Sequence, residues 1–217
     1  MDFAKARFNM VEGQLRPNRV TDPGLLDAMA EVPRESFLPE AKRPLAYVDE
    51  DIPLGGGRFL MEPMVFARLV QAAGVRPGCR VLVVGAGAGY GVAVLCRMGA
   101  RVVALETPGA LVESLRSRLS DIEGATVVAG PLVEGWAAAA PYDVILIEGA
   151  VEEIPGGLTE QLAEGGRLVT VRASSRPGVL GRAVRLLRAA GTVTEVVLFE
   201  AGTPTLPEFR RAPAFVF

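Results

Sequence analysis

Residues 81–91 read VLVVGAGAGYG, an uncharged run of valine and leucine that breaks into alternating glycines. Such a run is typical of a buried parallel strand entering a tight strand-to-helix turn, where glycine lets a ligand approach the backbone. The dinucleotide fingerprint needs glycine at its first, third and sixth positions, but the sixth position counted from Gly85 is Tyr90. A Walker loop is excluded because no Gly-Lys-Ser or Gly-Lys-Thr follows. The remaining pattern is G-x-G-x-G, at Gly85, Gly87 and Gly89.

From Cys79 onward, strand-like and helix-like patterns alternate. The expected strands are RVLVVG, RVVALE, ATVVAG, DVILIEG and GRLVTV, with helices over 89–98, 109–121 and 157–163. This alternation predicts an α/β fold with a doubly wound, mostly parallel Rossmann-like sheet. Residues 179–200 fit two structures, because three arginines recur at helical spacing while VTEVVLF is strand-like. We favour a C-terminal β-hairpin there, with the apolar end of the tail as a last edge strand.

The first 75 residues predict a helical and loop-rich cap over the strand ends. Helices are expected over 3–15, after a Thr21 or Asp22 cap through LLDAMAEV, and from Glu62-Pro63 to about Ala73. The stretch from VPRESFLPE to Gly57 is expected to be irregular. The prediction is one domain over 1–217, with the cap at 1–75 and a ligand-binding α/β core at 76–217.

The composition excludes several classes of function. The 217 residues carry a formal net charge of -2, which gives no electrostatic reason to expect nucleic acid or an anionic membrane as partner. No stretch reaches the roughly 20 apolar residues of a spanning helix, and the start lacks a secretory signal, so a cytoplasmic protein is expected. There is no histidine, and the two cysteines lack C-x-x-C spacing. We therefore expect no metal site and no histidine-dependent nucleophile.

An acidic residue ends the strand that follows the glycine turn. Glu106 ends the strand RVVALE, 21 residues beyond Gly85. A carboxylate there is placed to accept both hydroxyl hydrogens of a ribose. Alone, Glu106 would more often be a solvated charge, and the glycine turn alone could pack a helix on a strand without a ligand. Together they favour a nucleoside-containing ligand.

G-x-G-x-G followed by a strand-end acid is the pattern of S-adenosylmethionine-dependent methyltransferases. The chain resembles, more specifically, the protein-L-isoaspartate O-methyltransferase family, through LLDAMAEVPRESFLPE (25–40), AYVDEDIPLGGG (46–57), PGCRVLVVGAGAGYGVAVL (77–95), PYDVILIEGAVEEIP (141–155) and LAEGGRLV (162–169). The resemblance implies methylation of L-isoaspartyl or D-aspartyl carboxylates in damaged proteins, a form of protein repair. It implies S-adenosyl-L-methionine as cofactor, held by Gly85, Ala86, Gly87, Gly89, Tyr90 and Glu106. Methyl transfer to an ionised carboxylate needs positioning and no base, which suits a chain without histidine.

Three positions depart from the family pattern. The family loop GQTISQP reads GRFLMEP here, so Met61 takes the place of the serine treated as the active-site residue. The same alignment makes Arg58, Phe59 and Glu62 the expected acceptor-binding residues. Two further departures, Val83 and Gly130-Pro131, stand where the family has a glutamate for the cofactor's ammonium end and a Gly-Asp pair for its adenine.

These departures leave alternatives open. The chain is a repair methyltransferase, a methyltransferase with a different acceptor, or a catalytically degenerate relative that acts as a binding or scaffold protein. Arg58 would suit an anionic acceptor. A nicotinamide-dependent dehydrogenase is the rival on a similar sheet, and Tyr90 and Val92 at the sixth positions of the fingerprint argue against it. Nothing in the sequence indicates the oligomeric state.

Overall fold

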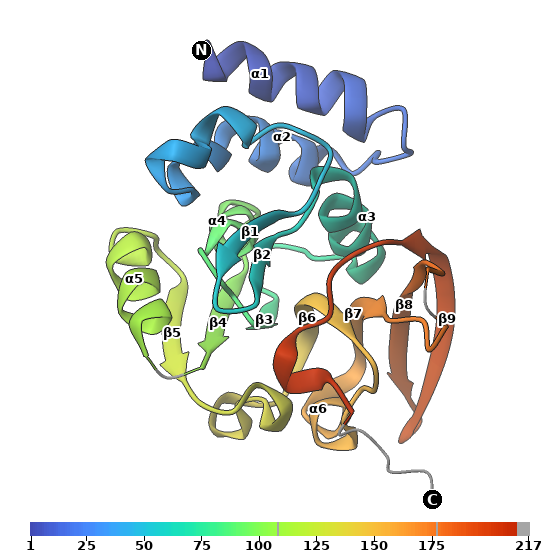
Figure 1. Cartoon of the computed structure of the whole chain (residues 1–217). Coiled ribbons are helices and arrows are strands. Elements are labelled where there is room, and N and C mark those ends of the chain that lie inside the picture. Colours follow the sequence, from blue (N-terminus) through green and yellow to red (C-terminus); the bar gives the residue numbers. More distant parts are fainter. Residues whose placement is uncertain (108, 177, 212–217) are drawn as a thin grey trace, which may run out of the picture.

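A seven-stranded sheet forms the centre of the molecule in the computed structural model, which describes residues 1–107, 109–176 and 178–211. Its strand order is β5-β4-β3-β6-β7-β8-β9 (Figure 1). Five neighbouring strands are parallel: β3 (Arg80–Val84), β4 (Arg101–Glu106), β5 (Ala125–Ala129), β6 (Tyr142–Val151) and β7 (Leu162–Arg172). The last two, β8 (Gly181–Ala189) and β9 (Thr192–Ala201), are antiparallel. The predicted doubly wound, mostly parallel sheet is confirmed.

The strand order reverses beside the glycine turn. The chain passes from β3 outward through β4 to β5, then returns to the other side of β3 as β6. Loops that leave β3 and β6 therefore diverge, which opens the carboxyl ends of these strands to a ligand. Gly85 follows the last residue of β3, so the turn lies at the switch point, as predicted.

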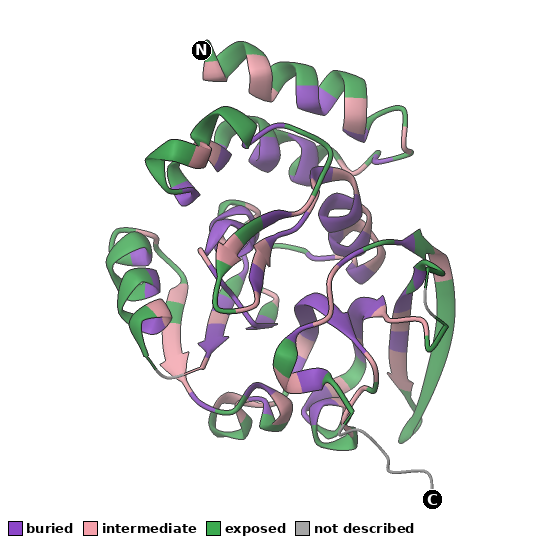
Figure 2. Ribbon diagram, viewed as in Figure 1, coloured by how far each residue is buried: buried purple, intermediate pink, exposed green. Residues whose placement is uncertain are grey.

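The sheet has a hydrophobic core on each face. Alternate residues of each strand pack into one core or the other, because side chains along a strand point to opposite faces. One face buries Val83 and Leu146 against α3 (Pro63–Ala73) and α4 (Tyr90–Arg97). The other face buries Leu82 and Ile145 under a different set of elements, which includes α6 (Gly156–Glu160) and the C-terminal residues Leu206 and Phe209. In Figure 2 the central strands are coloured largely as buried. α5 (Ala110–Leu119) packs beside β5.

The N-terminal part is largely helical, as expected. α1 (Phe3–Met10) continues as a π-helical turn (Val11–Leu15), and α2 (Pro23–Glu31) follows. The cap of α2 is Asp22, whose Oδ1 accepts a hydrogen bond from the Leu25 amide at 3.1 Å. The remaining short helical turns are 3-10: Arg34–Phe37, Glu40–Leu45, Leu132–Glu134, Ala137–Ala139 and Pro207–Phe209.

The stretch before Gly57 is not wholly irregular, and here the prediction is wrong. β1 (Ile52–Gly55) and β2 (Arg58–Leu60) form a two-stranded antiparallel hairpin. A side chain added at Gly87 would meet Leu54 and Arg58 of this hairpin. The hairpin therefore lies directly against the glycine turn.

Strands β8 and β9 form the hairpin that we favoured over a helix for this region. Its arginines at 182, 185 and 188 lie on β8. After β9 the chain turns back toward β6, where Thr205 forms a parallel bridge with Ala150. The apolar end expected as an edge strand lies in 212–217, outside the described residues. Among the residues that the structure describes, no helix is long and apolar enough to cross a membrane.

Candidate functional site

The three glycines of the turn adopt backbone conformations that other residues rarely take. Gly85, Gly87 and Gly89 have φ angles of 73°, 53° and 91°, all in the left-handed region that glycine tolerates. Gly89 also lies close to α5, since an added Cβ would approach Leu115 to 2.8 Å. The sequence pattern is therefore a requirement of this backbone, whatever the turn binds. Ala86, between two of these glycines, is buried.

Glu106 lies against the turn, where the sequence placed it. Its side chain is fully buried, and Oε2 accepts a hydrogen bond from the Gly87 amide at 2.9 Å. Oε1 accepts another from the Thr107 amide at 2.7 Å. The remaining donors come from Arg58, whose Nη2 donates to Oε1 at 2.7 Å and whose Nε lies 3.1 Å from both oxygens. These donors engage the roughly four acceptor positions of a carboxylate.

Arg58 is buried, with 2% of its surface exposed, and it connects two acids. Beyond Glu106, its Nη2 and Nη1 donate to Glu208 at 2.7 and 3.1 Å, and Nη2 also donates to the Thr107 hydroxyl at 2.9 Å. Burial lowers the pKa of Arg58, but the hydrogen bonds from its guanidinium to Glu106 and Glu208 outweigh it and raise the pKa. The guanidinium stays charged. We expected Arg58 to face an anionic acceptor; it faces two carboxylates of its own chain.

A C-terminal segment lies over the glycine turn. We call residues 203–209 the strap. Three backbone hydrogen bonds hold it to β6 and the residue after it: Ala150 N–H to Pro204 O (2.9 Å), Leu206 N–H to Ala150 O (2.9 Å) and Glu152 N–H to Phe209 O (3.2 Å). Figure 1 shows the strap returning from β9 toward β6 and α6.

Side chains of the strap fill the space that small residues leave. Leu206 lies so close to Gly149 and Gly85 that an added Cβ would come within 2.5 and 3.2 Å of it, respectively. Pro207 covers Gly57, the residue before Arg58. The strap therefore packs on both the turn and the β1–β2 hairpin.

In this conformation the residues at the turn do not accommodate a nucleoside group, although their chemistry suits one. The carboxylate that would accept the ribose hydroxyls is already engaged with Arg58. A cavity that touches Gly87 and Ala88 measures about 90 Å³, well below the roughly 300 Å³ or more of typical ligand pockets. A ribose could reach Glu106 only after Arg58 had moved.

The other expected site residues occupy several environments. Met61 is buried, and its carbonyl accepts a hydrogen bond from Arg34 Nη2 at 2.5 Å. Phe59 and Glu62 are half-buried. Burial, with Asp51, Asp49 and Glu50 nearby, raises the pKa of Glu62 to about 7.

Tyr90, which the resemblance assigns to the cofactor, is 1% exposed in this conformation. Its ring is buried between Phe37 and Phe66, with centroids 5.7 Å away in both cases. The Arg34 guanidinium carbon lies 4.9 Å from the Tyr90 centroid. Tyr90 is therefore a core residue in this conformation.

Sequence reasoning missed Glu148, a buried acid within β6. It lies two residues after Leu146, the register partner of Val83, so all three share one face of the sheet. Burial raises the pKa of Glu148 to about 8; the positive charge of Arg34 opposes this rise and Glu106 adds to it. Among the described residues, Glu148 Oε1, Arg34 Nη1 and the Tyr90 hydroxyl have no hydrogen-bond partner. The detectable signal was an acid at the end of the apolar run DVILIEG.

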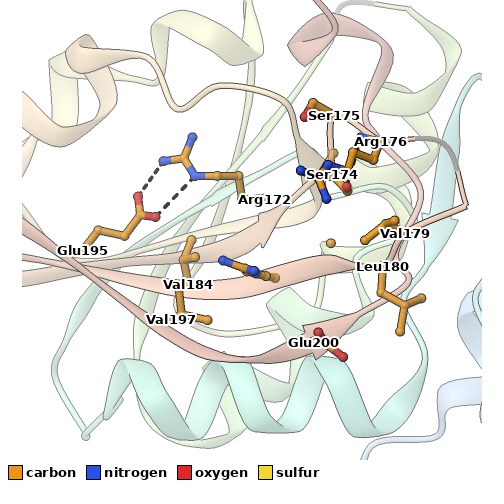
Figure 3. Close-up of a pocket in the computed structure, with 13 residues that line it drawn as sticks. Arg172, Ser174, Ser175, Arg176, Val179, Leu180, Val184, Glu195, Val197 and Glu200 are labelled. Carbon is orange, nitrogen blue, oxygen red and sulfur yellow. Dashed lines mark hydrogen bonds and ion pairs between the residues drawn. The ribbon is translucent and has the colours of Figure 1, made fainter.

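A larger cavity, of about 400 Å³, lies elsewhere, at the ends of β7, β8 and β9 (Figure 3). Arg172, Arg176 and Arg182 line it, but Arg172 is paired with Glu195 at 2.5 Å. The cavity shares no lining residue with the glycine turn. Within the described ranges, no group of three or more histidine, cysteine, aspartate or glutamate side chains could hold a metal ion.

Comparison with known proteins identifies the family. The family model described as Protein-L-isoaspartate(D-aspartate) O-methyltransferase matches residues 6–185. A protein-L-isoaspartate O-methyltransferase of Methylorubrum populi is 45% identical over 165 residues, which cover 76% of this chain and 78% of that protein. The chain belongs to the protein-L-isoaspartate O-methyltransferase family.

Other members of the family align over more of the chain. The protein-L-isoaspartate O-methyltransferase of a Roseiflexus species is 38% identical over 195 residues, covering 89% of this chain and 88% of that one. A solved structure of a protein-L-isoaspartate O-methyltransferase superposes with a TM-score of 0.80 at 26% identity, covering 92% of this chain and 65% of that one. A putative family member from Plasmodium falciparum, solved in complex with S-adenosyl-L-homocysteine, gives a TM-score of 0.78 at 19% identity over 93% of this chain and 98% of that one. The last comparison supports the fold alone.

Proposed function

We propose that this chain is an S-adenosylmethionine-dependent methyltransferase that methylates L-isoaspartyl and D-aspartyl carboxylates in damaged proteins. The observation that carries the proposal is the contact between Glu106 and the Gly87 amide, 2.9 Å long, in a chain that matches the family model over 6–185. It joins the strand-end acid to the glycine turn at the switch point of the sheet.

S-adenosylmethionine would supply an electrophilic methyl group: an oxygen of the substrate carboxylate would bond to the methyl carbon as the carbon–sulfur bond breaks, and S-adenosylhomocysteine would leave as the neutral thioether. The carboxylate is ionised at pH 7 and needs no base, so the protein's task is orientation. Gly85, Gly87 and Gly89 hold the turn open to the cofactor, and Glu106 takes its ribose once Arg58 has moved.

The loop that contains Met61 and Glu62 orients the acceptor. With a pKa of about 7, Glu62 is partly neutral at pH 7, which lessens its repulsion of an acceptor carboxylate.

The acceptor assignment is tested by transfer of a radiolabelled methyl group. We expect label in an isoaspartyl peptide and none in its aspartyl twin. Glu106→Gln should reduce transfer by about tenfold or more, since it removes a charged hydrogen-bond acceptor of ~1.5–3 kcal/mol from the ribose. Circular dichroism establishes that this variant is folded. Cofactor binding without label in either peptide would contradict the acceptor assignment and point to a different substrate.

The engagement of Glu106 by Arg58 favours a second candidate, a catalytically degenerate relative that binds partners through the same fold. The two candidates differ in one assay. If the wild type transfers no methyl group and the double variant Met61→Ser/Val83→Glu does, the degenerate candidate is supported. If the wild type methylates the isoaspartyl peptide, the degenerate candidate fails.

The proposal includes a cytoplasmic location and protein substrates. The formal net charge of -2 gives no electrostatic reason to expect nucleic acid as a partner. Substrates with exposed isoaspartyl sites would be peptides or partly unfolded proteins, which present a flexible chain to the acceptor loop.

A further inference from the structure

Arg58 contacts both Glu106, the carboxylate proposed to bind the ribose, and Glu208 of the strap. Arg58 donates from Nε and Nη2 to both oxygens of Glu106. A ribose offers two hydroxyl hydrogens to the same two oxygens. Since a carboxylate has about four acceptor positions and two are taken by backbone amides, Arg58 and a ribose compete for what remains.

The strap holds Arg58 from the other side. Glu208 accepts from both terminal nitrogens of Arg58, at 2.7 and 3.1 Å. Pro207 packs on Gly57, the residue before Arg58, and Leu206 packs on Gly85 and Gly149. Movement of Arg58 away from Glu106 therefore disturbs the strap, and departure of the strap removes one anionic partner of Arg58.

The exchange separates Arg58 from Glu106 but keeps Arg58 paired with Glu208. Arg58 and Glu208 together are neutral, so they can move toward water as a pair. Glu106 then keeps its hydrogen bonds from Gly87 and Thr107 and gains those of the ribose. The strap itself has three backbone hydrogen bonds to β6 and the residue after it. Its opening would also expose Leu206 and Phe209, which are buried in the second core, so the cofactor has to supply this free energy.

We propose that Arg58 and the strap form an autoinhibitory latch over the ribose site, and that binding of the cofactor releases the strap. The inference rests on the proposed cofactor. Strap opening and cofactor binding are then reciprocally coupled. A change that opens the strap increases the affinity for the cofactor, and bound cofactor favours the open strap. Only molecules with an open strap bind the cofactor, so the apparent affinity equals the affinity of the open form multiplied by the fraction of molecules that are open.

The first test is hydrogen exchange of the full chain with and without S-adenosylhomocysteine. The Leu206 and Glu152 amides, which donate across the strap, should exchange faster when the ligand is bound. Most binding sites show the opposite, because ligands usually slow exchange. Unchanged or slower exchange at both amides in the ligand-bound protein overturns the latch.

The second test measures S-adenosylhomocysteine affinity by calorimetry. Glu208→Gln weakens the hold of the strap on Arg58, so affinity should rise by about fivefold or more as the closed population falls. Glu153→Gln is the matched control, because it removes a carboxylate from the exposed ion pair with Arg211, and its affinity should equal that of the wild type. Equal affinity of Glu208→Gln and the wild type, or no binding by either, overturns the latch.

A disulfide that holds the strap closed tests the latch independently of the proposed methyl transfer. Ala150 and Thr205 are bridge partners, and neighbouring strands bring Cα atoms within the range that a disulfide spans. The oxidised Ala150→Cys/Thr205→Cys variant should lose affinity by about tenfold or more, and dithiothreitol should restore it. If tethering has no effect while the wild type methylates an isoaspartyl peptide, the latch fails and the function stands. If tethering and Glu208→Gln change affinity as stated but no peptide is methylated, the function fails and the latch stands.

Discussion

Glu148 shows how one buried carboxyl group makes the whole fold sensitive to pH. Burial raises its pKa to about 8 from an ordinary value of 4.5. The unfolded chain therefore releases this proton at a lower pH than the native protein does. Between these two pH values the native state binds more protons, so stability falls as pH rises and levels off above about 8.

Glu148→Gln should reduce this dependence; what remains includes the contribution of Glu62, whose pKa is raised to about 7. We expect the denaturant midpoint of the wild type to fall between pH 4.5 and about 8, and that of the variant to fall less, because an amide does not ionise. Exposed Glu160→Gln is the control and should keep the wild-type slope. Parallel pH profiles for wild type and Glu148→Gln would show that Glu148 is not the titrating group.

Arg58→Met should destabilise the protein by about 3–5 kcal/mol, because it leaves Glu106 charged and buried without its cation. Adding Glu106→Gln should recover much of the loss, since the amide carries no charge. Denaturant titration of the two single variants and the double variant measures this coupling. A double variant that is less stable than Arg58→Met would contradict the account.

At the scale of elements, the first turn of α4 depends on a glycine that no backbone angle requires. Gly91 has no positive φ, but an added Cβ would collide with the Glu148 carboxylate and approach Phe66 to 2.9 Å. The small residue on α4 therefore makes room for the acid on β6.

Gly91→Ala should cost about 1–3 kcal/mol, the usual penalty of overpacking. Gly13→Ala is the control, because an added Cβ there has nothing within 4 Å; it should be neutral or stabilising by up to about 1 kcal/mol. Melting temperatures of the two variants provide the comparison. Equal effects would mean that Glu148 moves aside freely.

Elements with strong local signals were predictable from sequence. The apolar run before Gly85 fixed β3, and α3 begins at Pro63 and ends at Gly74 in the left-handed conformation. The β1–β2 hairpin was not predicted, because its strands have four and three residues and are too short to show a periodic pattern.

The position of Glu106 was also predictable, because topology brings strand ends together. Its partner was not: Arg58 lies 48 residues earlier and Glu208 lies 150 residues after Arg58. In sequence both look like solvated charges. Only the packing of Leu206 and Pro207 on glycines places Glu208 within reach of Arg58, and no local pattern encodes that packing.

At the scale of the whole molecule, the two cores share the strands of one sheet. The first core joins the N-terminal helices to the sheet through α3, and the second contains the C-terminal residues Leu206 and Phe209. We therefore expect the cap and the α/β core to unfold together as a single domain.

Thermal unfolding followed by two probes checks this expectation. Trp136 is the single tryptophan and packs against the second core, whereas far-ultraviolet circular dichroism reports all helices, including α1, α2 and α3 of the cap. The two midpoints should coincide. An earlier loss of circular dichroism, with Trp136 fluorescence unchanged, would show that the cap is a separate unit.

The order of the latch along the chain has a consequence for the newly made protein. A ribosome releases the polypeptide from its amino end, and folding begins there. Arg58, the glycine turn and Glu106 emerge first, so the inner ion pair can form while β8, β9 and the strap are still being made. Leu206, Pro207 and Glu208 arrive last and add the outer layer. The order of synthesis therefore allows a nascent form in which Arg58 engages Glu106 before Glu208 is available.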